Sequence, residues 1–163
     1  MLGTMFAQNG VSHGWCPSVS AAIQQGMPQP SAGSDHPDAR RGTGKAVVII
    51  DDNASVRRIV GNAFLENGFS ACGEAENGKE GIEVIKKVKP DLAILDLSMP
   101  VMNGLEAATI LRKLFPNLPI ILFSMYSGEP IEAEAARVGV DAVVSKTEDM
   151  PALLDKAHEL LHI

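Results

Sequence analysis

The sequence predicts an α/β protein, a doubly wound five-stranded parallel sheet covered by helices on both faces. The first observation behind this prediction is that five short apolar runs alternate with five segments of helical periodicity. The second is that such an alternation requires right-handed crossovers, which make the strands parallel. The third is that Asp, Ser and Lys residues directly follow the ends of several runs. The 163 residues amount to one ordinary domain.

The first strand, helix and second strand are predicted between residues 47 and 74. Residues 47–50 form a bounded β-branched run that is typical of a buried strand. Residues 54–67 then carry apolar side chains at helical spacing, and Gly68 is suited to end that helix. A weaker strand is predicted at residues 69–74.

The middle of the chain repeats the pattern. A second helix is predicted after Asn77, with Pro90 ending it, since the residue before a proline disfavours helical backbone. Residues 92–95 form a third buried strand that ends at Asp96. A third helix is predicted at residues 105–115.

The last third of the sequence supplies two more strands and two more helices. The fourth strand is predicted at residues 120–123, directly before Ser124. A short alanine-rich helix follows at 131–138, and the fifth strand is predicted at 141–144, just before Lys146. Apolar residues three and four apart place the last helix between Met150 and Leu161.

Residues 1–44 differ from the rest and are predicted to be a disordered, low-complexity leader. They show neither a helical nor a strand period, and three prolines break their second half. A partner-binding segment around Trp15, or an over-long start with Met27 as another start site, stays open. The folded domain is therefore predicted at residues 45–163.

The composition excludes several classes of protein. Charges balance within the leader, so the whole net charge of −6 belongs to residues 45–163, and an acidic domain without a basic cluster argues against direct nucleic-acid binding. No apolar run reaches the length of a membrane span, and the N-terminus lacks the features of a secretory signal. Cys16 and Cys72 match no metal-ligand spacing, so a reducing cytoplasm is expected.

Polar residues at the strand ends should meet at one edge of the sheet. Ligands of such sheets bind outside the carboxyl ends of the strands, where the sequence places Asp51, Asp52, Asp96, Ser124 and Lys146. Three carboxylates at one edge repel one another unless a cation joins them, and oxygen ligands suit Mg²⁺. With Mg²⁺ present, one carboxylate could attack a phosphoryl group while the lysine and the hydroxyl neutralise its oxygens.

Four motifs give the ordered part a family resemblance. They are VVIIDDN at 47–53, LAILDLSMPVMNG at 92–104, PIILFS at 119–124 and VVSK at 143–146. With these motifs, residues 45–163 resemble the receiver domain of two-component response regulators over their whole length. The resemblance implies a flavodoxin-like (βα)5 fold with strand order 2-1-3-4-5.

The resemblance also implies roles for the acidic residues. Asp96 is then the phosphoacceptor. Mg²⁺ is then held by Asp52 directly, by Asp51 directly or through water, by Asp96, and by the backbone carbonyl of Ser98. Mg²⁺ is the one cofactor expected.

Two further residues take roles from the resemblance, and three positions depart from it. Ser124 occupies the position of the switch hydroxyl, and Lys146 that of the lysine that contacts the phosphoryl group. Receivers commonly carry an aromatic residue where this chain has Val143, and a small residue where it has Met125. Tyr126 follows, and we expect it to report phosphorylation in place of the missing aromatic ring.

The partners expected from the resemblance are a sensor histidine kinase or a histidine phosphotransfer protein. Output is expected through a downstream protein that binds the fourth helix, fifth strand and last helix, and a phosphorylation-dependent homodimer stays open. Because nothing follows Ile163, no attached effector is expected. The protein is expected not to be an enzyme beyond catalysing its own phosphorylation and dephosphorylation.

Ordinary structural roles remain open for each residue. The Asp51–Asp52 pair could cap a helix or lie exposed at a strand end, Asp96 and Ser124 could stabilise turns, and Lys146 could be a solvated charge. Other functions also remain open: the receiver fragment of a longer transcriptional regulator, a degenerate scaffold, or a haloacid dehalogenase-like phosphatase. The phosphatase is disfavoured because its first strand needs a second Asp two residues after the nucleophile, which this chain lacks.

Overall fold

The computed structural model describes residues 44–148 and 150–163, and in these residues strands and helices alternate strictly. All strand pairs are parallel and the order across the sheet is β2-β1-β3-β4-β5, which confirms the predicted fold class. The leader predicted at residues 1–44, with Cys16, Trp15 and Met27, lies outside the described residues apart from Gly44. The strands are β1 (Ala46–Ile50), β2 (Ser70–Ala75), β3 (Leu92–Leu95), β4 (Ile120–Ser124) and β5 (Ala142–Ser145).

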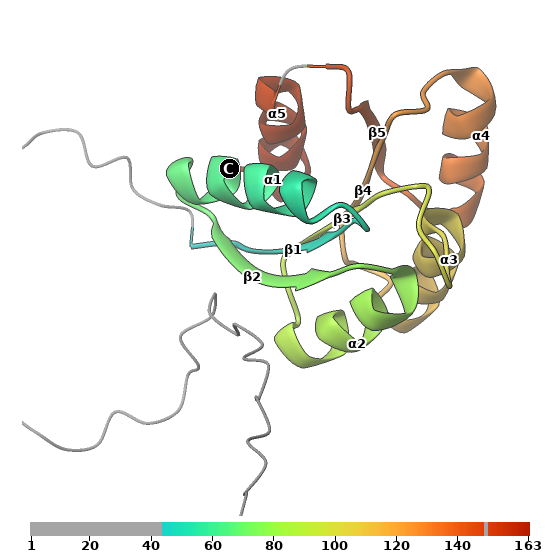
Figure 1. Ribbon diagram of the computed structural model, residues 1–163, viewed down its shortest axis with the longest axis horizontal. Helices are drawn as coiled ribbons and strands as arrows, with labels where there is room; N and C mark the ends of the chain where they lie inside the picture. Colours follow the sequence, from blue (N-terminus) through green and yellow to red (C-terminus); the bar gives the residue numbers. More distant parts are fainter. Residues whose placement is uncertain (1–43, 149) are drawn as a thin grey trace, which may run out of the picture.

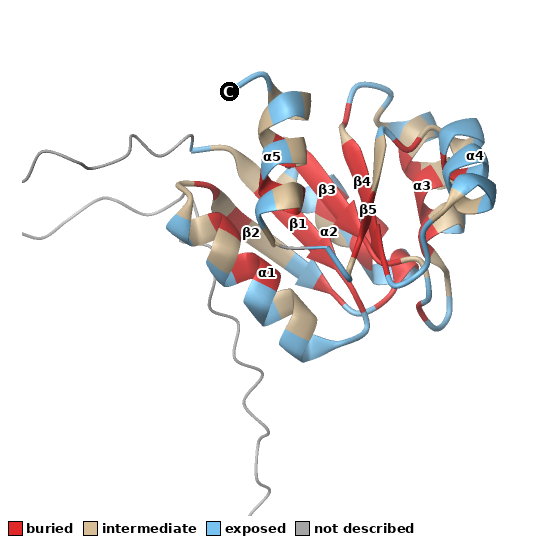
Figure 2. Cartoon of the chain, turned by 90° about the horizontal axis from the view of Figure 1, so that it is seen from above, coloured by how far each residue is buried: buried red, intermediate tan, exposed pale blue. Residues whose placement is uncertain are grey.

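The helices form one layer on each face of the sheet (Figure 1). Two helices, α1 and α5, pack on one face, and the other three pack on the opposite face. This arrangement buries the central strands on both sides, as the colours of Figure 2 show. The helices are α1 (Ala54–Glu66), α2 (Gly78–Val88), α3 (Gly104–Leu114), α4 (Glu129–Val138) and α5 (Met150–Leu161).

Alternation along the strands divides the core into two clusters. In β1, Val48 and Ile50 face the cluster under α2, α3 and α4, while Val47 and Ile49 face the cluster under α1 and α5. Successive side chains of a strand point to opposite faces, so an apolar run without polar interruptions supplies both clusters at once. Strands β1 and β3 are apolar throughout because helices cover the sheet on both sides.

An asparagine is the N-cap of each of the three helices that follow β1, β2 and β3. The side chain of Asn53 accepts the amides of Ser55 and Val56, so Asn53, and not Asp51 or Asp52, is the N-cap of α1. The N-cap reading of the Asp pair is therefore wrong. Asn77 caps α2 in the same way, and Asn103 forms a capping box with Glu106 at the start of α3.

Several predicted boundaries shift by one or two residues. Helix α4 begins at Glu129 and not at 131, because Pro130 lies in the first turn, where its missing N–H is not needed. Strand β2 begins one residue late, because the amide of Phe69 still bonds to Phe64 O and closes the end of α1 around Gly68. Strand β5 extends to Ser145, which pairs with Ser124.

In the part of the chain that the structure describes, no helix has the length and apolar character needed to cross a membrane.

Candidate functional site

The five polar residues predicted at the strand ends do come together at the carboxyl edge of the sheet. Asp51 directly follows β1, Asp96 follows β3, Ser124 ends β4, and Lys146 follows β5. Four of the five line a hollow of about 310 Å³. The fifth, Asp51, is buried and does not line it. The lining residues are Asp52, Asn53, Val56, Asp96, Ser98, Ser124, Met125, Tyr126 and Lys146.

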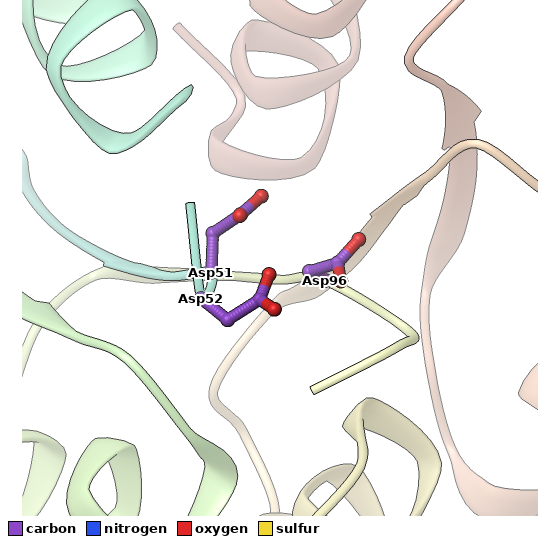
Figure 3. Close-up of side chains that lie close together, drawn as sticks. All are labelled: Asp51, Asp52 and Asp96. Atoms are coloured by element: carbon purple, nitrogen blue, oxygen red, sulfur yellow. The ribbon is translucent and has the colours of Figure 1, made fainter. Parts of the chain in front are cut away.

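Three carboxylates lie close together at this edge of the sheet (Figure 3). Asp51, Asp52 and Asp96 each place one carboxylate oxygen within 4.8 Å of the others. Asp51 and Asp96 are buried, whereas Asp52 is exposed. Donors made only of oxygen, close together and partly open to solvent, suit a hard cation such as Mg²⁺ that keeps several of its waters. The residues present therefore fit the predicted cation.

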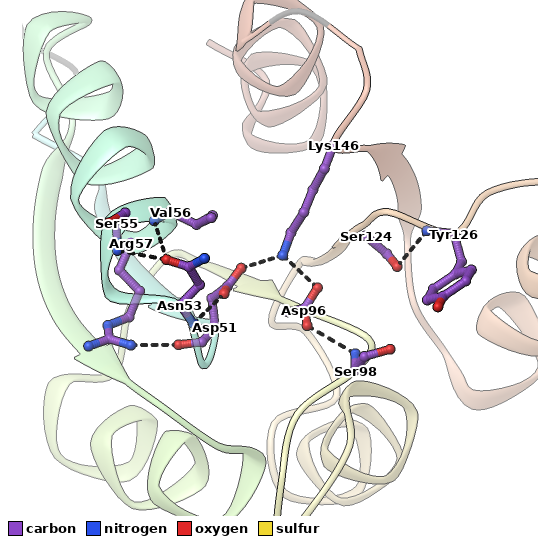
Figure 4. A network of polar contacts seen from close by, with 10 residues as sticks. All are labelled: Asp51, Asn53, Ser55, Val56, Arg57, Asp96, Ser98, Ser124, Tyr126 and Lys146. Carbon is purple, nitrogen blue, oxygen red and sulfur yellow. Dashed lines mark hydrogen bonds and ion pairs between the residues drawn. The ribbon is translucent and has the colours of Figure 1, made fainter.

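Lys146 lies between two of these carboxylates (Figure 4). Its Nζ is 2.6 Å from Asp51 Oδ2 and 2.7 Å from Asp96 Oδ1. The side chain is only 13% exposed, so the reading of Lys146 as a solvated charge is wrong. Its ammonium group offsets part of the repulsion between the carboxylates.

The pKa values of both Asp96 and Lys146 are raised, for different reasons. For Asp96, burial raises the pKa of the carboxyl and the charge of Asp51 adds to this, while the hydrogen bond from Lys146 opposes it without cancelling it. For Lys146, burial acts to lower the pKa of the ammonium, but its hydrogen bonds to Asp51 and Asp96 outweigh burial and raise it. Lys146 is therefore a fixed positive charge at neutral pH.

Each polar group of Asp51 has a partner. Its amide donates to Ala75 O at 3.1 Å, and its Oδ1 accepts the amide of Asn53 at 2.8 Å. Its carbonyl oxygen accepts a hydrogen bond from Arg57 Nη1 at 2.7 Å. Neither Arg57 nor Asn53 was predicted from the sequence, and the only signal for Asn53 is that an asparagine stands directly before a helix.

Asp96 and Ser124 also make the turn contacts that were left open for them. The amide of Ser98 donates to Asp96 Oδ2 at 3.0 Å, and the amide of Tyr126 donates to Ser124 Oγ at 3.0 Å. The structural role is therefore confirmed for both residues, and their site role stays a prediction. A hydroxyl that accepts one bond still has its own O–H to donate, and Ser124, although buried, lines the hollow.

The three departures from the receiver pattern lie around β4 and β5. Val143 is half-buried and packs against the cluster under α2, α3 and α4. Met125 and Tyr126 are 61% and 62% exposed, and both line the hollow. At the position of the usual aromatic residue, Val143 thus packs against the core. The aromatic ring of Tyr126 lies on the surface instead, next to Ser124.

Comparisons with known proteins agree with this geometry. The sequence model of the response regulator receiver domain matches residues 47–158. The chemotaxis protein CheY of Halobacterium salinarum is 30% identical over 117 residues, covering 72% of this chain and 97% of that protein. The nitrate/nitrite response regulator protein NarL of Escherichia coli K12 is 34% identical over 114 residues, covering 69% of this chain and 53% of NarL.

Other relatives match in part, and solved structures match the fold. CheY of Thermotoga maritima is 42% identical over 60 residues, which are 37% of this chain and 50% of that protein. The chain thus spans about half the length of several of these relatives. The response regulator domain of T. maritima CheB superposes with a TM-score of 0.67 at 27% identity, covering 73% of this chain and 97% of that one. The chain belongs to the response regulator receiver domain family of two-component signalling.

Proposed function

We propose that the chain accepts a phosphoryl group on Asp96 and that its phosphorylated form signals by binding another protein. The donor is the phosphohistidine of a sensor histidine kinase or of a histidine phosphotransfer protein. One observation carries the proposal: a buried Asp96 carboxylate faces the hollow, 2.7 Å from Lys146 and within a cluster of three carboxylates. Family membership supports it.

The transfer is a displacement at phosphorus. A carboxylate oxygen of Asp96 forms a bond to phosphorus, the bond from phosphorus to the histidine nitrogen breaks, and the imidazole leaves with that electron pair. Lys146 Nζ, already beside Asp96, balances negative charge on the phosphoryl oxygens. Ser124 donates its O–H to one of these oxygens once the group is attached.

The cation would be held by the carboxylates of Asp51, Asp52 and Asp96 together with the backbone carbonyl of Ser98. When bound there, Mg²⁺ supplies positive charge that reduces repulsion between these carboxylates and the incoming phosphoryl oxygens. Asp52 is the exposed member of the set, so it faces the solvent from which the cation arrives.

We propose that the signal leaves through α4, β5 and α5. Phosphorylation replaces the single charge of the Asp96 carboxylate by an acyl phosphate of about −1.5 to −2 charges, so up to about one negative charge is added beside Ser124 and Lys146, at the start of the segment that leads into α4. This helix has one buried residue, Ala135, and no side chain caps its beginning at Gly128. A helix that buries only one residue is suited to shift between two positions. Tyr126, exposed next to Ser124, lies where such a shift begins.

The central test compares the wild-type protein with Asp96→Asn after incubation with acetyl phosphate and Mg²⁺. The wild-type protein is expected to gain the mass of one phosphoryl group, and Asp96→Asn none, because an amide oxygen is a poor nucleophile. Asp155→Asn, which changes an exposed carboxylate on α5, serves as the matched control and should be modified like the wild type. Equal modification of Asp96→Asn would contradict the proposal, and steady hydrolysis of a phosphomonoester would favour a phosphatase.

A second candidate is the receiver part of a longer transcriptional regulator. The observation that favours it is the coverage of NarL and of a putative transcriptional regulator of Pseudomonas aeruginosa, of which the chain spans 53% and 56%. The sequence encoded directly beyond Ile163 in the source genome would decide between this candidate and a stand-alone receiver.

A further inference from the structure

Arg57, on the first turn of α1, contacts the peptide that joins the two neighbouring acidic residues. Its Nη1 donates to Asp51 O at 2.7 Å (Figure 4). That oxygen belongs to the peptide between Asp51 and Asp52. The plane of this peptide sets ψ of Asp51 and φ of Asp52, so holding its carbonyl restricts the direction in which the Asp52 side chain leaves the backbone.

Glu74 in β2 fixes the other side of the same guanidinium. Arg57 Nε lies 3.1 Å from Glu74 Oε2, and the arginine side chain is only 16% exposed. The planar fork of an arginine can hold two acceptors at once in a fixed geometry, which a lysine cannot do. The guanidinium thus ties the turn after β1 to the edge strand of the sheet.

The remaining contacts of Asp51 do not replace this one. Its amide is held by Ala75 O, and its carboxylate by the Asn53 amide and by Lys146. These contacts fix the amide and the carboxylate of Asp51. None of them reaches its carbonyl oxygen. That oxygen is held by Arg57, directly before the exposed Asp52.

We propose that Arg57, oriented by Glu74, is a positioning residue of the cation site, which holds the Asp51–Asp52 peptide so that the Asp52 carboxylate faces the other two carboxylates. This role rests on the proposed function, in which these carboxylates bind Mg²⁺. Partners of this kind, which orient a metal ligand without touching the metal, typically change metal affinity by about 10–100-fold when they are removed.

The sign of the effect separates positioning from simple electrostatics. Arg57→Met removes a positive charge near a cation site, so Coulomb repulsion alone predicts that Mg²⁺ binds more tightly to the variant. Positioning predicts the opposite, a Kd for Mg²⁺ that rises about 10-fold. The experiment is a calorimetric titration of the full chain with Mg²⁺, without any phosphoryl donor, next to a measurement of thermal unfolding.

Arg112→Met is the matched control for a general loss of stability. Arg112 also donates to a carbonyl, Gly139 O at 2.9 Å, and pairs with a carboxylate, Asp141 at 2.7 Å. It joins the end of α3 to the segment between α4 and β5, away from the acidic cluster. This variant is expected to lose stability and to keep the wild-type affinity for Mg²⁺.

Glu74→Ala is the second variant. If Arg57→Met does not fold, this variant tests the positioning role instead. Its Kd for Mg²⁺ is expected to rise about 3-fold or more, because a guanidinium without its anchor holds the peptide less firmly. Glu76→Ala, which removes an exposed carboxylate two residues further along, controls for the lost charge and should bind like the wild type.

Each outcome is decisive. Unchanged or tighter Mg²⁺ binding by Arg57→Met, equal weakening in Arg112→Met, or equal effects of Glu74→Ala and Glu76→Ala would each overturn the positioning role. If the wild-type protein binds no Mg²⁺ at all, or if Asp52→Asn binds it as well as the wild type, the cation site of the proposed function fails instead.

Discussion

The Asp96 carboxylate lies in surroundings that oppose its negative charge. Burial and the neighbouring charge of Asp51 raise its pKa, and Lys146 offsets only part of this effect. A carboxylate kept in such a position is destabilising to the fold, and a cation bound beside it would relieve this conflict.

This conflict predicts the effect of Asp96→Asn on stability. Because the pKa of Asp96 is raised in the folded state, its contribution to stability is fully present below the ordinary value of 3.8 and is lost as the pH rises through the folded-state pKa. The amide does not ionise and escapes this loss. Asp96→Asn should therefore be more stable than the wild type at pH 7, by on the order of 1 kcal/mol without Mg²⁺.

The measurement is urea unfolding of both proteins at a series of pH values. The difference in the free energy of unfolding should shrink as the pH falls through the folded-state pKa of Asp96 toward 3.8, and it should be gone below 3.8, where both proteins carry a neutral group at this position. Asp155→Asn should show no such trend, since Asp155 is exposed. An Asp96→Asn protein that is less stable than the wild type at pH 7 would contradict the prediction.

The roles of single residues could be predicted from the sequence only where backbone geometry alone brings them together. Asp51, Asp96, Ser124 and Lys146 follow parallel strands, so their meeting at one edge follows from the fold. The contact of Arg57 with a carbonyl also depends on the rotation of α1 about its axis. The spacing of apolar residues predicts neither this rotation nor the register shift of β2 opposite Val47 and Val48.

Among the elements, the start of α3 packs closely against the backbone of Asp96. The amide of Gly104 donates to Leu97 O at 3.0 Å, and a Cβ on Gly104 would lie 2.2 Å from Asp96 O. That oxygen is backbone and cannot turn aside as the end of a flexible side chain could. The start of α3 can therefore approach Asp96 only because residue 104 has no side chain.

Gly104→Ala should consequently disturb both the fold and the site. The added carbon forces the backbone of Asp96 or the start of α3 to move, so we expect a loss of about 3 kcal/mol in stability, together with reduced phosphorylation. Thermal unfolding and modification by acetyl phosphate measure the two effects.

Gly61→Ala, in α1, is the control, because its Cβ would meet only Ile49 Cδ1 at an ordinary 3.7 Å. This change should stabilise α1 by about 0.5–1 kcal/mol, as alanine is the better helix former. A Gly104→Ala protein as stable as the wild type would show that the loop has room that its geometry does not indicate.

The order and type of the elements could be predicted from periodicity, but their ends could not. Strand β3 was placed at its observed bounds, since apolar residues fill it and polar ones flank it. The predicted start of α4 lies two residues after the observed one, because Pro130 falls in the first turn, where a helix accepts proline. Such ends depend on local hydrogen bonds that periodicity does not record.

On the scale of the whole molecule, the first described residues are already tied to the sheet. Lys45 Nζ lies 3.0 Å from Asp91 Oδ1, and the amide of Ala46 donates to Asp91 Oδ2 at 2.9 Å. Burial acts to raise the pKa of Asp91, but these two hydrogen bonds outweigh it and lower the pKa. The amide of Gly44 also donates to Gly68 O. These contacts hold the first described residues on the sheet, and the domain boundary at residue 45 stays a prediction.

A chain that begins at Gly44 should therefore fold on its own. Its free energy of unfolding should lie within about 0.5 kcal/mol of the full chain, because the clusters on both faces of the sheet and the Asp91 contacts are retained. Thermal unfolding and Mg²⁺ titration of the two chains, side by side, test this. A broad, non-cooperative transition in the shorter chain would contradict the boundary.

The bond between Lys146 and Asp51 joins positions 95 residues apart, and this distance has a consequence for biosynthesis. At about 5–20 residues per second, a ribosome adds Lys146 some 5 to 20 s after Asp51. During that interval the nascent acidic pair has no lysine beside it. A growing chain therefore cannot form this ion pair until its fifth strand has emerged and docked, so the acidic edge of the sheet is completed only late in synthesis.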